Sequence, residues 1–205
     1  MKNYLSDIFK KYDGKCSELN IWLEDNTAEQ LWGMGVMPAY SLEPYSCELQ
    51  GNQPGKMLLG KFLSPSVNKQ KYFLDAHGNI IGETRYAKFL DKKKEWIVYR
   101  KFYLKRENEI IGLIFGSSLE KHNDASLSNV VLVKLDNGKV ASSFFYSYDD
   151  KFSEKKYLYK DNGIINIEQR MWLDTYIEHY FTIETSPMLM INENTDNGII
   201  RIYPN

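Results

Sequence analysis

The chain has 205 residues, of which 43% are hydrophobic and 26% charged, an ordinary composition for a folded domain. Its 26 basic and 27 acidic side chains leave a net charge of −1, which gives no general attraction to nucleic acid or to an anionic membrane surface. Residues 1–15 mix charged with apolar side chains, so they do not resemble a secretion signal, and no stretch is apolar enough for a transmembrane helix. We therefore expect a cytoplasmic protein with a single domain over residues 1–205.

The N-terminal part of the chain has a helical and irregular pattern. Between Asn3 and Tyr12 the apolar side chains recur at helical spacing, which predicts a first helix. A second short helix is predicted to begin at Asn26 or Thr27, since both residue types favour the first position of a helix. It should end by Gly33 or Gly35. The prolines that follow predict an extended or irregular segment.

From residue 56 onward the pattern changes to β, with short alternating apolar and aromatic runs separated by polar turns. The strongest signals for tight type I′ hairpins are the Asn-Gly pairs at 137–138, 162–163 and 197–198. Further turns are expected at 91–94, 117–129 and 148–154. Consecutive hairpins predict a mainly β protein, an antiparallel meander of about ten strands closed as a barrel or folded as a sandwich. The domain would then consist of a helical and irregular segment, 1–55, and a β meander, 56–205.

The sequence contains no recognisable motif for catalysis, metal binding or phosphate binding. The three histidines, His77, His122 and His179, have no metal-ligand spacing. The two cysteines, Cys16 and Cys47, have no histidine close in sequence and are expected to be ordinary thiols. We therefore predict no catalytic residue, no metal and no cofactor.

The most informative stretch runs from Arg170 to Thr185, where an unusually long alternation predicts one strand. One face of this strand, which includes His179, has the pattern of a core. The other face alternates aromatic with acidic side chains: Trp172, Asp174, Tyr176, Glu178 and Tyr180. Aromatic side chains with a polar group are enriched in interface hot spots, and carboxylates between them suit a basic partner. This face is thus the predicted protein-binding site, unless the helices or a second sheet cover it or it lines a cavity.

The general build of residues 56–205 resembles the immunity proteins of bacterial polymorphic-toxin and contact-dependent-inhibition systems. The shared features are a small, aromatic-rich β chain, Asn-Gly hairpins and an acidic-aromatic strand, and they transfer no residue roles. The resemblance implies a non-enzymatic protein that binds a cognate toxin domain tightly and neutralises it, over its active site or beside it. The near-neutral charge departs from the strongly acidic immunity proteins, which argues against a nuclease as the partner.

Two other functions are compatible with the same pattern. One is a carrier of a small ligand such as a lipid or chromophore, in which the meander closes into a lipocalin-like calyx. Its cavity would be lined by residues such as Phe102, Phe144 and Tyr146. The other is a hydrolase-like enzyme on a β scaffold, with Glu178, His179 and Asp174 as the acid–base group. A large internal cavity would favour the carrier, and a pocket that brings those three side chains together would favour the enzyme.

Overall fold

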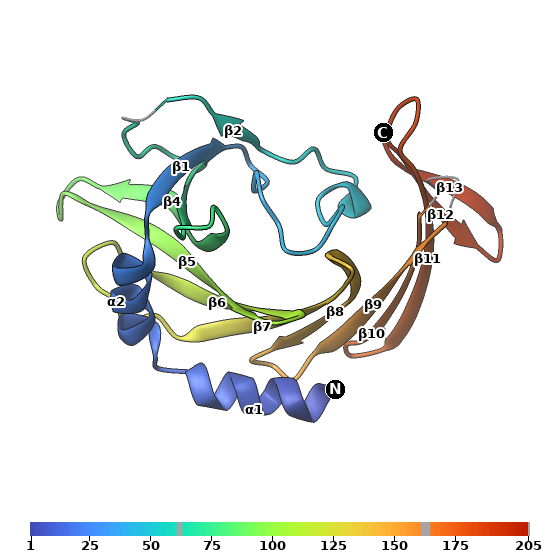
Figure 1. The fold of residues 1–205 in the computed structure, drawn as a ribbon, viewed down its shortest axis with the longest axis horizontal. Coiled ribbons are helices and arrows are strands. Elements are labelled where there is room, and N and C mark those ends of the chain that lie inside the picture. Colours follow the sequence, from blue (N-terminus) through green and yellow to red (C-terminus); the bar gives the residue numbers. More distant parts are fainter. Residues whose placement is uncertain (61–62, 161–164, 205) are drawn as a thin grey trace.

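The computed structural model describes residues 1–60, 63–160 and 165–204 and is mainly β (Figure 1). The chain begins with two helices, α1 (Lys2–Tyr12) and α2 (Cys16–Asn26), and a short 3-10 helix, η1 (Glu48–Gln50), follows later. The strands are β1 (Glu29–Met34), β2 (Lys56–Leu58), β3 (Lys69–Leu74), β4 (Ile80–Leu90), β5 (Glu95–Arg106), β6 (Glu109–Leu119), β7 (Leu127–Asp136), β8 (Lys139–Ser147), β9 (Phe152–Tyr159), β10 (Ile165–Trp172), β11 (Tyr176–Glu184), β12 (Met190–Thr195) and β13 (Gly198–Tyr203).

The strands form one antiparallel sheet, and from β3 to β13 each strand pairs with the next along the chain. The predicted antiparallel meander is therefore confirmed. Within the described residues the sheet has 13 strands instead of about ten, and it is open, with β2 at one edge and β13 at the other. Figure 1 shows it curled into a trough. The prediction of a barrel or a sandwich is wrong, because one sheet neither closes nor faces a second sheet.

The turns of the meander follow the sequence signals in part. Asn137 and Gly138 both have positive φ, 49° and 78°, and connect β7 to β8 as predicted. The β12–β13 turn lies one residue earlier than the predicted pair, at Asp196 and Asn197, and Gly198 begins the strand. The predicted turn at 162–163 lies outside the described residues.

The predicted single strand from Arg170 to Thr185 is wrong, because the structure places a hairpin within it. Strand β10 ends at Trp172 and β11 begins at Tyr176, and these two residues pair directly across the turn. The backbone N–H of Leu173 donates to the carbonyl of Thr175 at 3.1 Å inside this turn. Cross-strand partners share a face, and Trp172 and Tyr176 are an even number of residues apart. The alternation therefore continues across the turn as if the strand were unbroken.

Helix α1 confirms the first predicted helix, but the second prediction is wrong. Asn26 ends α2 instead of beginning a helix: its side-chain amide donates to the carbonyl of Trp22 at 2.8 Å. The residues predicted as helical, 29–34, form β1, which pairs with β2 on one side and β3 on the other. Two neighbouring strands and the burial of Trp32 outweigh a weak local preference for helix.

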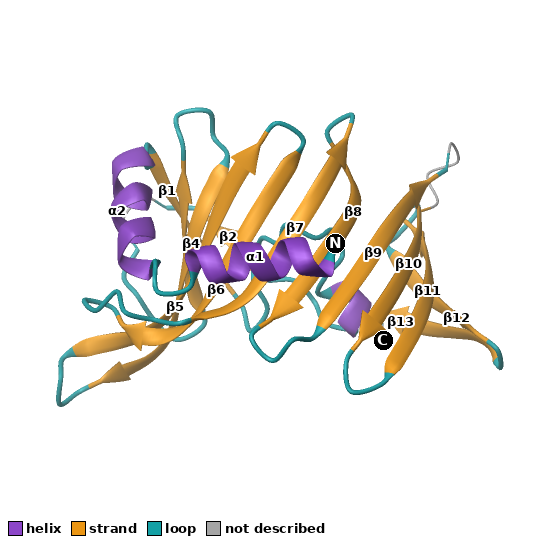
Figure 2. Ribbon diagram, turned by 90° about the horizontal axis from the view of Figure 1, so that it is seen from below, coloured by secondary structure: helices purple, strands orange, loops and turns teal. Residues whose placement is uncertain are grey.

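The helices cover the convex face of the sheet, where α1 packs on β7 and β8 (Figure 2). Phe102, Phe144 and Tyr146 belong to the apolar cluster beneath them. Phe102 contacts Phe115 edge-on at 5.6 Å between ring centroids, and Tyr146 contacts Phe9 of α1 at 5.9 Å. The three residues predicted to line a ligand cavity are thus packed in the core between helices and sheet.

The concave face is filled by the chain itself. We call residues 35–55, which connect β1 to β2 and lie inside the trough in Figure 1, the strap. The hydroxyl of Tyr72 accepts the backbone N–H groups of Ala39 at 3.0 Å and Tyr40 at 3.3 Å. The Tyr40 ring lies edge-on against Tyr72 and against Tyr103, whose ring centroid is 5.7 Å away. The strap therefore occupies the space that a calyx would leave for its ligand.

The strap also joins the two halves of the sheet. At its centre, the Glu43 carboxylate lies 2.8 Å from the Lys155 ammonium of β9 and accepts a hydrogen bond from Ser143 of β8 at 2.6 Å. Further along, Tyr45 and Leu49 pack against the apolar cluster of β9–β12. Because the same segment contacts β3 and β5 through Tyr40, it holds together strands that the open sheet does not connect directly.

Candidate functional site

The predicted binding face lies on a part of the convex surface that no helix covers. Helix α1 begins over β8 and runs toward β7, and in Figure 2 no described element lies over β10 and β11 on this side. Trp172, Tyr176 and Tyr180 are 39%, 52% and 43% exposed. Of the three predicted possibilities for this face, the structure shows the exposed one. We call these three rings, with Glu178 and Arg170 beside them, the aromatic platform.

Hydrogen bonds within the platform hold its two tyrosine rings in place. The Glu178 carboxylate accepts hydrogen bonds from both tyrosine hydroxyls, from Tyr180 at 2.8 Å and from Tyr176. Arg170 lies 3.2 Å from Glu178 and 3.5 Å from Glu154, so its guanidinium bridges two carboxylates. The hydrogen bonds from Tyr176 and Tyr180, together with the charge of Arg170, hold the pKa of Glu178 below its usual range. Glu178 is therefore ionised at neutral pH and orients the rings.

The aromatic side chains continue from the core to the surface in one row. Phe152, which is buried in the core beneath the helices, lies 5.3 Å from Trp172, and Trp172 lies 5.3 Å from Tyr176. A buried ring at one end restricts the motion of the exposed rings beyond it. Asp174 lies outside this row, in the turn between β10 and β11. There it is close enough to Lys151 to contribute, after Asp149, to raising the pKa of that ammonium.

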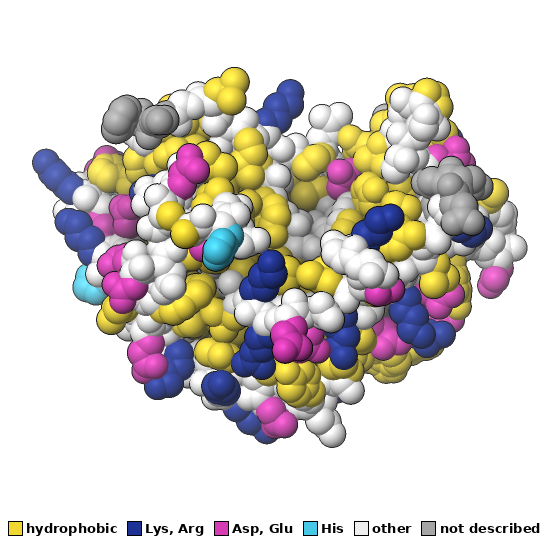
Figure 3. Space-filling model, viewed as in Figure 1, with side chains coloured by type: hydrophobic (Ala, Val, Ile, Leu, Met, Phe, Trp, Pro, Cys, Tyr) yellow, Lys and Arg dark blue, Asp and Glu magenta, His cyan; other side chains and the backbone are white. Residues whose placement is uncertain are grey.

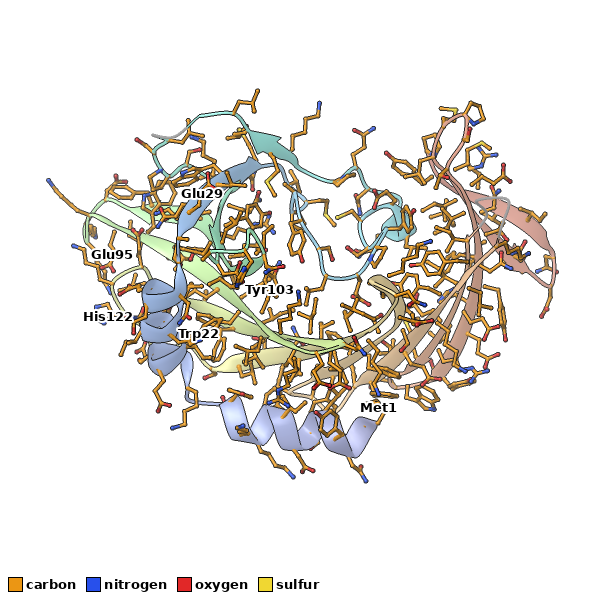
Figure 4. The ribbon with its side chains drawn as sticks, in the orientation of Figure 1. Met1, Trp22, Glu29, Glu95, Tyr103 and His122 are labelled. Atoms are coloured by element: carbon orange, nitrogen blue, oxygen red, sulfur yellow. The ribbon has the colours of Figure 1, made fainter. Side chains whose placement is uncertain are left out.

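The group predicted for an enzyme is not assembled. Glu178 faces the convex side, whereas His179, the next residue of β11, faces the trough. The His179 ring stacks on Phe181 at 5.7 Å between centroids, and its Nδ1 lies 2.5 Å from a carboxylate oxygen of Glu193. This placement confirms His179 on the core face. His122 lies in the β6–β7 loop, at the end of the sheet opposite β11 (Figure 4).

A second polar cluster, which the sequence analysis missed, lies under the strap. The buried Glu83 carboxylate of β4 contacts the Lys101 ammonium at 3.0 Å and the Tyr103 hydroxyl at 3.2 Å, both from β5. Burial and the nearby Glu83 charge raise the pKa of Tyr103. The adjoining cavity is about 80 Å³, enough for water but small for a ligand. No sequence signal singles out Glu83 and Lys101, because β4 and β5 contain several other charged side chains.

On the face that Figure 3 shows, basic and acidic side chains are interspersed among the described residues. Among the described residues, no three His, Cys, Asp or Glu side chains lie together as a metal site would require. Both cysteines are buried free thiols. In the described part of the chain no helix has the length and hydrophobicity to span a bilayer.

Comparison with known proteins finds no matching family model, no matching curated protein and no matching solved structure. The aromatic platform and its surroundings are therefore interpreted from their geometry.

Proposed function

We propose that this chain is a non-enzymatic protein-binding protein that docks its partner on the aromatic platform. The observation that carries the proposal is that Trp172, Tyr176 and Tyr180 are each about two-fifths exposed or more and are held in place. Both tyrosine hydroxyls donate to Glu178, and the Trp172 ring packs between Phe152 and Tyr176. Exposed tryptophan and tyrosine side chains are the residues most enriched in binding hot spots. Because their orientation is set before binding, little conformational entropy is lost when a partner covers them.

The partner we propose is a bacterial toxin domain, which this chain neutralises in the cytoplasm as an immunity protein does. Carboxylates surround the platform: Glu168 lies directly opposite Tyr180, Glu154 contacts Arg170, and Asp174 lies at the turn. Because Arg170 is already paired with Glu178 and Glu154, Glu168 and Asp174 are the acids that would meet basic groups of the partner. Such charges at the rim increase the rate of association more than the final affinity.

The proposal is tested by coexpressing this chain with the toxin domain encoded beside its gene. We expect 1:1 co-elution and protection of cell growth. The double variant Trp172→Ala/Tyr176→Ala should lose about 2 kcal/mol per ring, or roughly a thousandfold in affinity. The matched control is Tyr99→Ala, which removes a similarly exposed ring from β5 and should bind normally.

Thermal unfolding of the same variants distinguishes binding from folding. Because the rings are exposed, the double variant should unfold close to the wild-type temperature. A variant that folds normally and still binds the toxin domain with wild-type affinity would refute the platform as the docking site. A variant that fails to fold would show instead that the two rings stabilise the core.

A further inference from the structure

The two edges of the sheet differ in how they are protected against pairing with another strand. Strand β2 has three residues, begins with Lys56 and directly follows Gly55. Strand β13 is twice as long and mostly apolar, with Ile199 72% exposed and Ile200 52% exposed. Edge strands of natural proteins are usually short, charged or covered, because an open edge pairs with other chains. Among the described residues β13 pairs with β12 alone, so its outer side has no strand partner, although η1 packs against β13 and the register of the β12–β13 pair shifts between Ile191 and Asn192.

The one charged residue of β13 does not block the edge. Arg201 is tied back to the neighbouring strand, where its Nε donates to the side-chain oxygen of Asn192 at 2.7 Å. The two-residue turn at 196–197 also fixes which backbone groups are free. Antiparallel hydrogen bonds alternate along a strand, and Gly198 pairs with Thr195 next to the turn. The N–H and C=O groups of Ile199 and Arg201 are therefore directed away from β12.

We propose that β13 pairs antiparallel with β13 of a second copy of this chain, about a twofold axis at Ile200. In this register Ile199 lies opposite Arg201 of the second copy, so both residues with outward backbone groups form hydrogen-bonded pairs. The two Ile200 side chains meet on the axis, at a pair without hydrogen bonds, where side chains approach most closely.

The composition of the strand favours a second copy as the occupant. The register centred on Ile200 avoids the like-charge contact that an axis at Arg201 would create. It also lays the aliphatic stem of Arg201 over the exposed Ile199 of the second copy. A six-residue strand buries less area than a standard stable interface, so the dimer should be weak and reversible. The aromatic platform lies on β10 and β11 and takes no part in this contact.

Sedimentation velocity over a range of concentrations tests this dimer. The wild-type chain should convert reversibly from monomer to dimer as its concentration rises. Ile200→Lys and Ile200→Glu each place like charges on the axis and should weaken the dimer at least about tenfold. An equimolar mixture of these two variants should dimerise again, because lysine then faces glutamate. The matched control, Ile21→Lys on the exposed side of α2, should dimerise as the wild type does.

A wild-type chain that stays monomeric at every concentration would overturn the proposal, as would a dimer that Ile200→Lys leaves unchanged. A monomeric chain that loses toxin binding on Ile200→Lys would overturn it too, and would assign this edge to the toxin. The platform variant Trp172→Ala/Tyr176→Ala should dimerise normally, so failure of the dimer and failure of the proposed function are measured separately.

Discussion

Replacing Glu43 by glutamine should weaken the attachment of the strap to the far half of the sheet. Glu43 is the strap residue whose carboxylate contacts both β8 and β9, through Ser143 at 2.6 Å and Lys155 at 2.8 Å. The Glu43 and Lys155 side chains are only 17% and 14% exposed. Breaking a fully buried ion pair from one side costs about 3 to 5 kcal/mol. Since water reaches this pair and glutamine keeps one hydrogen bond, we expect a loss of about 2 to 3 kcal/mol.

The loss should depend on pH in a defined direction. Burial alone would raise the pKa of Glu43, but the charge of Lys155 and the hydrogen bonds from Lys155 and Ser143 outweigh burial and lower it. The folded pKa is therefore below the ordinary value of 4.5. A lowered folded pKa stabilises the protein above that ordinary value, and the stabilisation disappears as the pH falls toward the folded pKa. The difference between wild type and Glu43→Gln should thus be largest at neutral pH and shrink in acid.

Urea denaturation at neutral and acidic pH measures both effects. The double-mutant cycle of Glu43→Gln with Lys155→Met isolates the energy of the pair, because the double variant leaves neither charge unpaired. Glu18→Gln is the control: it removes an exposed pair with Lys15 and should change stability little. A Glu43→Gln variant as stable as the wild type, or equally destabilised at both pH values, would refute the role of Glu43 as an ionised anchor.

Two further predictions concern the strap and the convex core. Gly55→Ala should cost about 1 to 3 kcal/mol in chemical denaturation, because its Cβ would lie 2.6 Å from the carbonyl oxygen of Met37. Gly116→Ala, with no neighbouring atom closer than 3.5 Å, should have little effect, and equal losses for the two variants would contradict this reasoning. Phe102→Ala should cost about 3 to 5 kcal/mol, since its ring is fully buried under the helices. A loss below about 1 kcal/mol would show that this core is loosely packed.

Several features that depend on residues close in sequence were predicted, but helix α2, Cys16–Asn26, was not. Helix α1 follows from apolar spacing within a few turns, and the β7–β8 hairpin follows from Asn137 and Gly138, which adopt positive φ at low cost. The common face of Trp172, Tyr176 and Tyr180 was also predicted correctly, although the hairpin within it was missed. The alternation of side chains determines which face of the sheet a residue lies on. Because Trp172 and Tyr176 are an even number of residues apart, the alternation continues across the turn and gives no sign of it.

Features that depend on distant residues were decided only by the tertiary structure. The segment 29–34 became a strand because β2 and β3 pair with both of its edges. Glu43 and Lys155 are 112 residues apart, and nothing near either of them in sequence indicates that they meet. Whether the meander closes depends on the summed curvature of many strands and on the strap that fills the trough. The exposure of the aromatic platform depends on where α1 begins over the sheet, because local patterns specify which way a side chain points and packing specifies what covers it.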